Sequence, residues 1–148
     1  MPQFSFIPTA ETPDIADDVR ELFEELAAQL PHEHRAYSGE CRPALDVVET
    51  DEAVQIVVDL AGVKAEAVRV LVRNGVVIIA GEKAPPPGNG AQAFHLVERD
   101  FGRFARAVRL TGSYDVAGAT ASLRNGELAI VLRKMADRRG RGHRIPIE

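Results

Sequence analysis

The stretch of sequence that decides the fold reads VRVLVRNGVVIIA and runs from Val68 to Ala80. Its first half alternates valine with arginine or leucine, so the valines share one face of an extended chain. Asn74-Gly75 follows, and this dipeptide is typical of the two-residue turn that joins antiparallel strands. The apolar run after the turn supplies a second strand. The whole segment therefore predicts a β-hairpin.

Similar runs lie on both sides of this hairpin. β-branched or alternating segments occupy Leu45–Thr50, Val54–Leu60, Phe104–Leu110, Ala119–Leu123 and Leu128–Leu132. Asn125-Gly126 joins the last two into a second hairpin, and His95–Arg99 can form a short strand after the loop at Ala84–Ala93. Seven or eight short strands with no helix between them predict an all-β fold, an immunoglobulin-like antiparallel β-sandwich.

The N-terminal region has a helical period instead. One apolar stripe contains Ile15, Val19, Leu22, Phe23, Leu26 and Leu30. Thr12 can cap the helix, Pro13 suits its first turn and Pro31 ends it. The stripe of this amphipathic helix requires a partner, which can be its own domain, another subunit or a client protein.

A chain of 148 residues suits one core with modest tails. The polar stretch Pro31–Pro43 is predicted to be a linker. We therefore expect a helical arm and linker at 1–42, a β domain at 43–134 and a flexible C-terminal extension at 135–148.

Charge is distributed unevenly along the chain, whose net charge is −4. Residues 1–42 contain nine acids and three arginines, which gives −6, whereas residues 133–148 contain six bases and two acids, which gives +4. Such ends can attract each other between copies. Nucleic acid would require one strongly basic face, so we expect no nucleic-acid partner.

Signatures of common enzymes do not occur in the sequence, including the Gly-x-x-x-x-Gly-Lys loop, the Gly-x-Gly-x-x-Gly fingerprint and the Gly-x-Ser-x-Gly elbow. His32 and His34 are close in sequence, but a zinc site requires three or four converging ligands, so a surface pair is favoured. Cys41 has no evident base nearby in sequence. We expect no enzymatic activity, no cofactor and no metal.

The compartment is suggested by two features. Cys41 is the single cysteine and cannot form an internal disulfide, which favours a reducing environment. The first residues lack the basic start and apolar run of a signal peptide, and no stretch approaches the ~20 apolar residues of a membrane span. The sequence predicts a soluble cytoplasmic protein.

Several landmarks then occur in a characteristic order. They are Pro43 to Thr50 followed by Asp59-Leu60-Ala61-Gly62-Val63, Asn74-Gly75 through Gly81-Glu82-Lys83, Glu98 to Arg106, Ala121 to Leu128 and Ile145-Pro146-Ile147. Together they resemble the α-crystallin domain of the small heat-shock proteins, of the bacterial and plant type with a long loop. The sequence departs from the family pattern in two places: Ala61 stands where proline is usual, and the segment Leu132-Arg133-Lys134 differs from the common Pro-Lys ending.

The resemblance implies an ATP-independent holdase, a chaperone that binds partly unfolded clients and prevents their aggregation. Such a protein requires apolar surface that its own assembly partly hides. The candidates for client binding are Phe4, Phe6, Ile7, Leu22, Phe23 and Leu26. The same residues can instead pack between subunits.

The resemblance also implies strand exchange between two subunits. Phe94, His95, Leu96 and Val97 would cross to the partner and pair with the edge near Leu45 and Val47. Exchange would remove two exposed sheet edges at once. The alternative is a lid that folds back on its own domain.

Arg106 matches the structurally sensitive arginine of that family. It shares the parity of Phe104, Val108 and Leu110, so it points toward the apolar side and requires a partner there. The alternative is a side chain that extends past the sheet edge.

The end of the chain provides an anchor on this interpretation. Ile145 and Ile147 project from one side of an extended segment, and Pro146 stiffens it. The resemblance places the accepting groove on a neighbouring subunit, with Val70, Val72, Ala121 and Leu123 as its lining. The alternatives are a disordered tail and, for the whole chain, a co-chaperone module of the CS type that does not assemble through a tail.

Overall fold

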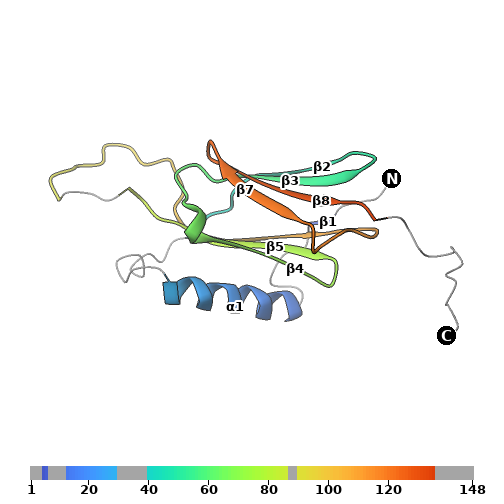
Figure 1. The fold of residues 1–148 in the computed structure, drawn as a ribbon. Helices are drawn as coiled ribbons and strands as arrows, with labels where there is room; N and C mark the ends of the chain where they lie inside the picture. The colour runs from blue at the N-terminus through green and yellow to red at the C-terminus, as the bar shows by residue number, and fades with distance from the viewer. Residues whose placement is uncertain (1–4, 7–12, 30–39, 87–89, 136–148) are drawn as a thin grey trace, which may run out of the picture.

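Two four-stranded antiparallel sheets pack face to face in the computed structural model, which describes residues 5–6, 13–29, 40–86 and 90–135 (Figure 1). Sheet A has the order β1-β6-β5-β4, with bounds Ser5–Phe6, Gly102–Arg109, Val76–Lys83 and Val68–Arg73. Sheet B has the order β2-β3-β8-β7, with bounds Leu45–Glu49, Ala53–Asp59, Glu127–Arg133 and Thr120–Arg124. This arrangement confirms the predicted β-sandwich.

Both predicted hairpins form at Asn-Gly turns. Asn74 and Gly75 have φ of 53° and 75°, and Asn125 and Gly126 have φ of 52° and 75°. Two successive positive φ values define the turn whose twist matches that of the strands it joins. The turns set the registers, in which Arg73 is opposite Val76 and Arg124 is opposite Glu127.

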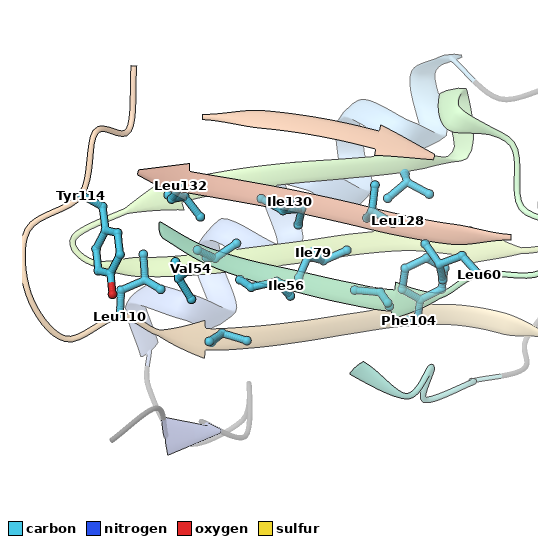
Figure 2. Close-up of a cluster of buried hydrophobic side chains, with 14 residues drawn as sticks. Val54, Ile56, Leu60, Ile79, Phe104, Leu110, Tyr114, Leu128, Ile130 and Leu132 are labelled. Atoms are coloured by element: carbon cyan, nitrogen blue, oxygen red, sulfur yellow. The ribbon is translucent and has the colours of Figure 1, made fainter. Parts of the chain in front are cut away.

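The core lies between the two sheets, where alternate residues of β3, β5, β6 and β8 point inward (Figure 2). Fully buried members from β3, β5 and β8 include Val54, Ile56, Val58, Val77, Ile79 and Leu132. Close packing extends to Gly81, where an added Cβ would lie 2.5 Å from Cζ of Phe104. Glycine at this position therefore lets the Phe104 ring fill the end of the core.

The α-helix α1 (Pro13–Gln29) covers the outer face of sheet A (Figure 1), and a short 3-10 helix, η2 (Ala65–Ala67), precedes β4. This answers the question that the sequence left open, because the helix stripe packs on its own domain. It also explains the continuous apolar run of β5, whose residues 76–81 are all buried: one face of the strand meets the core and the other meets the helix. Within the described residues, no helix has both the length and the apolar character needed to cross a membrane.

Two local features differ from the sequence predictions. His95–Arg99 forms no strand, and residues 90–100 are exposed, because in a single chain this segment has no sheet edge beside it. β1 was not predicted, since its two residues carry no pattern and are held by pairing with Val108 and Arg109 at the edge of β6. The predicted linker lies largely outside the described residues. At its end, the main chain of Glu40 forms an isolated parallel β-bridge with Arg103.

Candidate assembly and client-binding surfaces

The segment that leads into β2 crosses from one sheet to the other. The Cys41 amide donates to the carbonyl of Arg103 in sheet A over 3.0 Å, and the Asp59 amide donates to the carbonyl of Ala44 in sheet B over 2.9 Å. Arg106, on the inward side of β6, donates a hydrogen bond from its guanidinium to the carbonyl of Pro43 between these two points. Arg106 thus fixes the crossing that positions β2.

The environment of Arg106 is unusual for a charge. Its side chain is 8% exposed, and it is the one charged residue that is buried in the described part of the chain. Burial lowers the pKa of the guanidinium, and the nearby positive charge of Arg42 lowers it further. An arginine remains protonated under such conditions, so its charged hydrogen bond to the carbonyl is retained.

The loop between β5 and β6 exposes apolar side chains. Phe94, Leu96 and Val97 are 69%, 75% and 62% exposed, and His95 is exposed with them. The chain brings none of these four residues onto its own sandwich, as Figure 1 shows for the extended loop. Large apolar groups at this exposure are typical of a surface that a partner covers.

The edge of β2 is the proposed receiver of that loop. β2 is a terminal strand of sheet B and, among the residues that the structure describes, pairs with β3 alone. Leu45 and Val47 lie on its inward side and are half-buried against the core, while Val48 on the other side is 48% exposed. The outer main-chain groups of this strand are therefore available to a further strand.

β4 and β7 are the terminal strands at the opposite side of the sandwich. Val70 and Val72 of β4 and Leu123 of β7 point inward and are half-buried against the core. Ala121 shares the inward parity of Leu123 but is exposed. The four predicted lining residues thus lie on the inward side of the two edge strands, where apolar surface is incompletely covered.

The outward-facing residues of sheet A under α1 form an apolar surface that we call the α1 seat. It consists of Leu71, Val76, Ile78, Ala80, Ala105 and Ala107. Ile15 and Leu22 of the helix are buried on it, with Val19 and Phe23 packed beside them. Leu26 is buried as well, at 2% exposure. Leu22 and Leu26 are therefore covered in this arrangement and not available to a client.

Polar contacts surround the α1 seat, and the sequence reasoning missed them. They are Arg73 with Asp18 and with Glu21 at 3.7 Å, Arg69 with Gln29 and with Glu25 at 4.0 Å, and the Arg103 guanidinium 5.3 Å from the centre of the Phe23 ring. The arginines of β4 have the parity opposite to its valines, and the helix acids recur every three or four residues. This pairing of patterns is the signal that could have revealed the contact.

Several predicted residues lie outside the described part of the chain. Phe4, Ile7 and the C-terminal Ile145, Pro146 and Ile147 belong to this group. Phe6 is described by its main chain alone, as part of β1.

The chemistry of the described residues does not indicate a reactive centre. Among them, no group of three or more His, Cys, Asp or Glu side chains is placed to hold a metal ion. Burial raises the pKa of the Cys41 thiol, and the charge of Lys83 opposes this change only in part. A raised pKa disfavours the thiolate that a nucleophile requires.

Known proteins are similar to this chain in sequence and in fold. Residues 46–148 match the family model described as Hsp20/alpha crystallin family. Heat shock protein 16 of Schizosaccharomyces pombe is 32% identical over 138 residues, which cover 90% of this chain and 89% of that protein. The 22.0 kDa heat shock protein of Arabidopsis thaliana is 33% identical over 102 residues, 68% of this chain but 52% of the plant protein. The chain thus spans about half the length of this plant relative.

Solved structures agree with these relatives. Heat shock protein 16.0 from Schizosaccharomyces pombe superposes with a TM-score of 0.60 at 30% identity, covering 73% of this chain and 99% of that one. A small heat-shock protein from Xylella fastidiosa, described as having a distinct high order structure, gives 0.62 at 29% identity and covers 73% and 97%. The chain therefore belongs to the Hsp20/α-crystallin family of small heat shock proteins, which are chaperones of the stress response and not enzymes.

Proposed function

We propose that this protein is an ATP-independent holdase that works as a dimer-based homo-oligomer and binds partly unfolded proteins. The observation that carries the proposal is the exposed apolar loop, in which Phe94, Leu96 and Val97 have no cover within the described chain. A lone subunit with such a loop would itself be prone to associate. Membership of the small heat shock protein family favours self-association, that is, assembly with further copies of this chain.

The dimer would form by exchange of the loop. In an extended conformation Phe94 and Leu96 lie on one side of the loop strand and His95 and Val97 on the other. Added to the free edge of β2, this strand would extend sheet B of the partner and place one side against apolar surface near Leu45 and Val47. Each subunit would donate one strand and receive one, which satisfies both edges.

Larger assemblies would form through the C-terminal extension. Ile145 and Ile147 would insert between β4 and β7 of a neighbour, beside Val70, Val72 and Leu123. Each contact is weak and reversible, and many together stabilise the assembly. Arg138 to Arg144 provide the length and positive charge of the connecting arm.

Clients would bind apolar residues of the N-terminal arm. Phe4, Phe6 and Ile7 precede the helix in sequence and are the first candidates. Leu22 and Leu26 become available only when α1 leaves sheet A, because both are buried there, whereas Phe23 is partly buried. We also propose a reducing compartment such as the cytoplasm, since Cys41 has no second cysteine with which to form an internal disulfide.

A co-chaperone module of the CS type is the alternative. It would have a related sandwich and no tail-dependent assembly. The mass of the protein in solution separates the two, because a monomer fits the CS-type module and a dimer or larger assembly fits the holdase. The exposed loop between β5 and β6 favours the assembly.

The test is recovery of a complex with a client. A heat-labile enzyme is warmed with the protein in the absence of nucleotide, and soluble material is separated by size. Co-elution of the unfolded enzyme with the protein in a large soluble complex supports the proposal. Precipitation of the enzyme to the same extent as in buffer alone would refute it.

A further inference from the structure

The end of β8 is held by two other parts of the chain, and we propose that this contact is an exit clamp that fixes the direction in which the C-terminal extension leaves the sandwich. The exit clamp consists of Glu49 and Glu52 at the β2–β3 turn, Ser113–Asp115 between β6 and β7, and Lys134. Lys134 acts in it as a positioning residue. The proposal rests on the assembly described above, in which the extension links dimers.

The main chain after β8 is hydrogen-bonded on both of its edges. On the side of β3, the amide of Lys134 donates to the carbonyl of Glu52 over 2.8 Å. On the other side, the β6–β7 loop provides two main-chain bonds of 2.8 and 2.9 Å, from the Met135 amide to the Ser113 carbonyl and from the Asp115 amide to the Arg133 carbonyl. The direction of the chain is therefore set up to Met135, where the described part of the chain ends.

Both parts that hold the end of β8 are themselves fixed. Tyr114 belongs to the hydrophobic core, so its buried ring keeps the β6–β7 loop against the sandwich. In the β2–β3 turn, the hydroxyl of Thr50 accepts hydrogen bonds from the amides of Glu52 and Ala53 over 3.3 and 3.1 Å. The exit clamp thus exists before the extension docks, which reduces the conformational entropy that docking costs.

The side chains of Lys134 and Glu49 complete the exit clamp. Lys134 has the inward parity of Leu132, and Glu49 has the inward parity of Val47, so the two charges meet where the core ends. Nζ of Lys134 lies 2.5 Å from Oε1 of Glu49, and the side chains are 30% and 20% exposed. Salt screens a partly buried pair less than an open surface pair. The pair also joins the exit of the extension to the last residue of β2.

A fixed exit has a consequence for assembly. Residues 136–144 separate Met135 from the anchor at Ile145, and nine residues span at most about 30 Å. A free exit would let this arm reach grooves in many directions, and each direction would give a different geometry between neighbouring dimers. A fixed exit favours one geometry, which closed assemblies with a narrow range of subunit numbers require.

The experiment measures the direction of the extension in the full-length protein. Spin labels are attached at Gln55→Cys, which is exposed on β3, and at Arg138→Cys, in a Cys41→Ser background. Labelled protein is diluted with an excess of unlabelled protein, so the measured distance lies within one subunit. Lys134→Met removes the charge and keeps the apolar stem, and Lys64→Met, at an exposed lysine before η2, is the matched control.

We expect the distribution of distances between the labels to widen at least about twofold in Lys134→Met and to stay unchanged in Lys64→Met. Glu49→Gln removes the charge of the partner side chain and should widen the distribution in the same way. Equal widths in the parent and in both clamp variants would overturn the proposal.

Reversal of the two charges separates positioning from a general loss of stability. Glu49→Lys alone and Lys134→Glu alone each place like charges together, so each should widen the distribution. The double variant restores an ion pair, and we expect it to recover at least about half of the lost narrowness. A double variant as broad as its single variants would contradict the positioning role.

Native mass spectrometry of the same proteins tests the consequence for assembly. We expect Lys134→Met to keep its dimers and to widen the range of subunit numbers at least about twofold. A wider distance distribution with an unchanged range of subunit numbers would refute the effect on assembly. A monomeric parent would refute the proposed assembly itself, whereas the distance distributions decide on the exit clamp in either case.

Discussion

Arg106 connects the two sheets at the point where the chain crosses between them. Its position on β6 is opposite Ile79, on the inward side of the strand, and its hydrogen bond reaches the carbonyl of Pro43 just before β2. The charge is therefore retained in the core through a main-chain acceptor. β2 is also the edge on which the proposed dimer depends, so this contact links stability to assembly.

We predict that Arg106→Ala lowers the free energy of unfolding by about 2 to 3 kcal/mol, because it removes a charged hydrogen bond and leaves the carbonyl of Pro43 without this donor. Urea unfolding measures the change. Arg109→Ala is the matched control, since Arg109 is exposed on the same strand. Equal small effects of the two substitutions would show that the buried contact does not stabilise the fold.

Tyr114 predicts a dependence of stability on pH. Its ring is buried in the core, and burial and then the charge of Glu49 raise the pKa of its hydroxyl, with Lys134 opposing (Figure 2). A group whose pKa is raised on folding holds its proton more tightly in the folded state. The Tyr114 hydroxyl therefore contributes fully to the free energy of unfolding below its unfolded pKa of about 10. This contribution is lost as the pH rises through the pKa of the folded state.

We therefore expect the parent to lose free energy of unfolding relative to Tyr114→Phe between about pH 9 and pH 11. Urea unfolding of both proteins across this range measures the difference. The pKa of Lys134 is also raised, by its hydrogen bond to Glu49, so its titration changes the free energy of unfolding in the same direction. Introducing Lys134→Met into both proteins removes this second contribution. A difference that stays constant with pH would contradict the argument.

The loop between β5 and β6 does not pack on the sandwich of its own subunit, and its residues 90–100 are exposed. Phe94 and Leu96 are more exposed than the other large apolar residues described. We predict that Phe94→Ser with Leu96→Ser shifts the protein to monomers, because it removes the side chains that a partner would cover. The sandwich should stay folded, since neither residue contributes to the core.

Light scattering measures the mass and circular dichroism the fold. Val116→Ser is the control, because Val116 is apolar and 49% exposed but lies between β6 and β7. A loop variant that keeps the mass of the parent would argue that the loop is a lid on its own domain.

The elements that could be predicted from the sequence are those whose structure is determined by neighbouring residues in the chain. Asn74-Gly75 and Asn125-Gly126 favour turns through their own backbone preferences, and alternation assigns the faces of the strands that flank them. The inward direction of Arg106 follows from the same alternation. These features need no knowledge of the partner element.

The elements that the sequence did not predict depend on a partner. β1 exists because the edge of β6 is available, and His95–Arg99 lacks such an edge in one chain. The contact of Arg69 and Arg73 with α1 depends on which face of sheet A remains uncovered. Pattern and propensity describe what a segment can do, and tertiary contacts decide whether it does so.

The whole molecule is expected to assemble through its C-terminal extension. Burial of two isoleucine side chains favours docking by roughly 3 to 6 kcal/mol before the ordering of the tail is subtracted, so single contacts are reversible. We predict that Ile145→Ala with Ile147→Ala reduces large assemblies to dimers and leaves the sandwich folded. Light scattering measures this change in mass.

Arg144→Ala is the control, because it alters the adjacent residue and leaves the apolar side chains in place. An oligomeric parent whose mass is unchanged by the double substitution would show that the extension is not the link between dimers.

The most direct measurement of the chaperone role is light scattered by a heat-labile client protein during warming, with and without this protein and with and without ATP. We predict that the protein suppresses the rise in scattering to the same extent in both nucleotide conditions, because binding to apolar surface requires no chemical step. Suppression that appears only with ATP, or no suppression at equimolar concentration, would contradict the account.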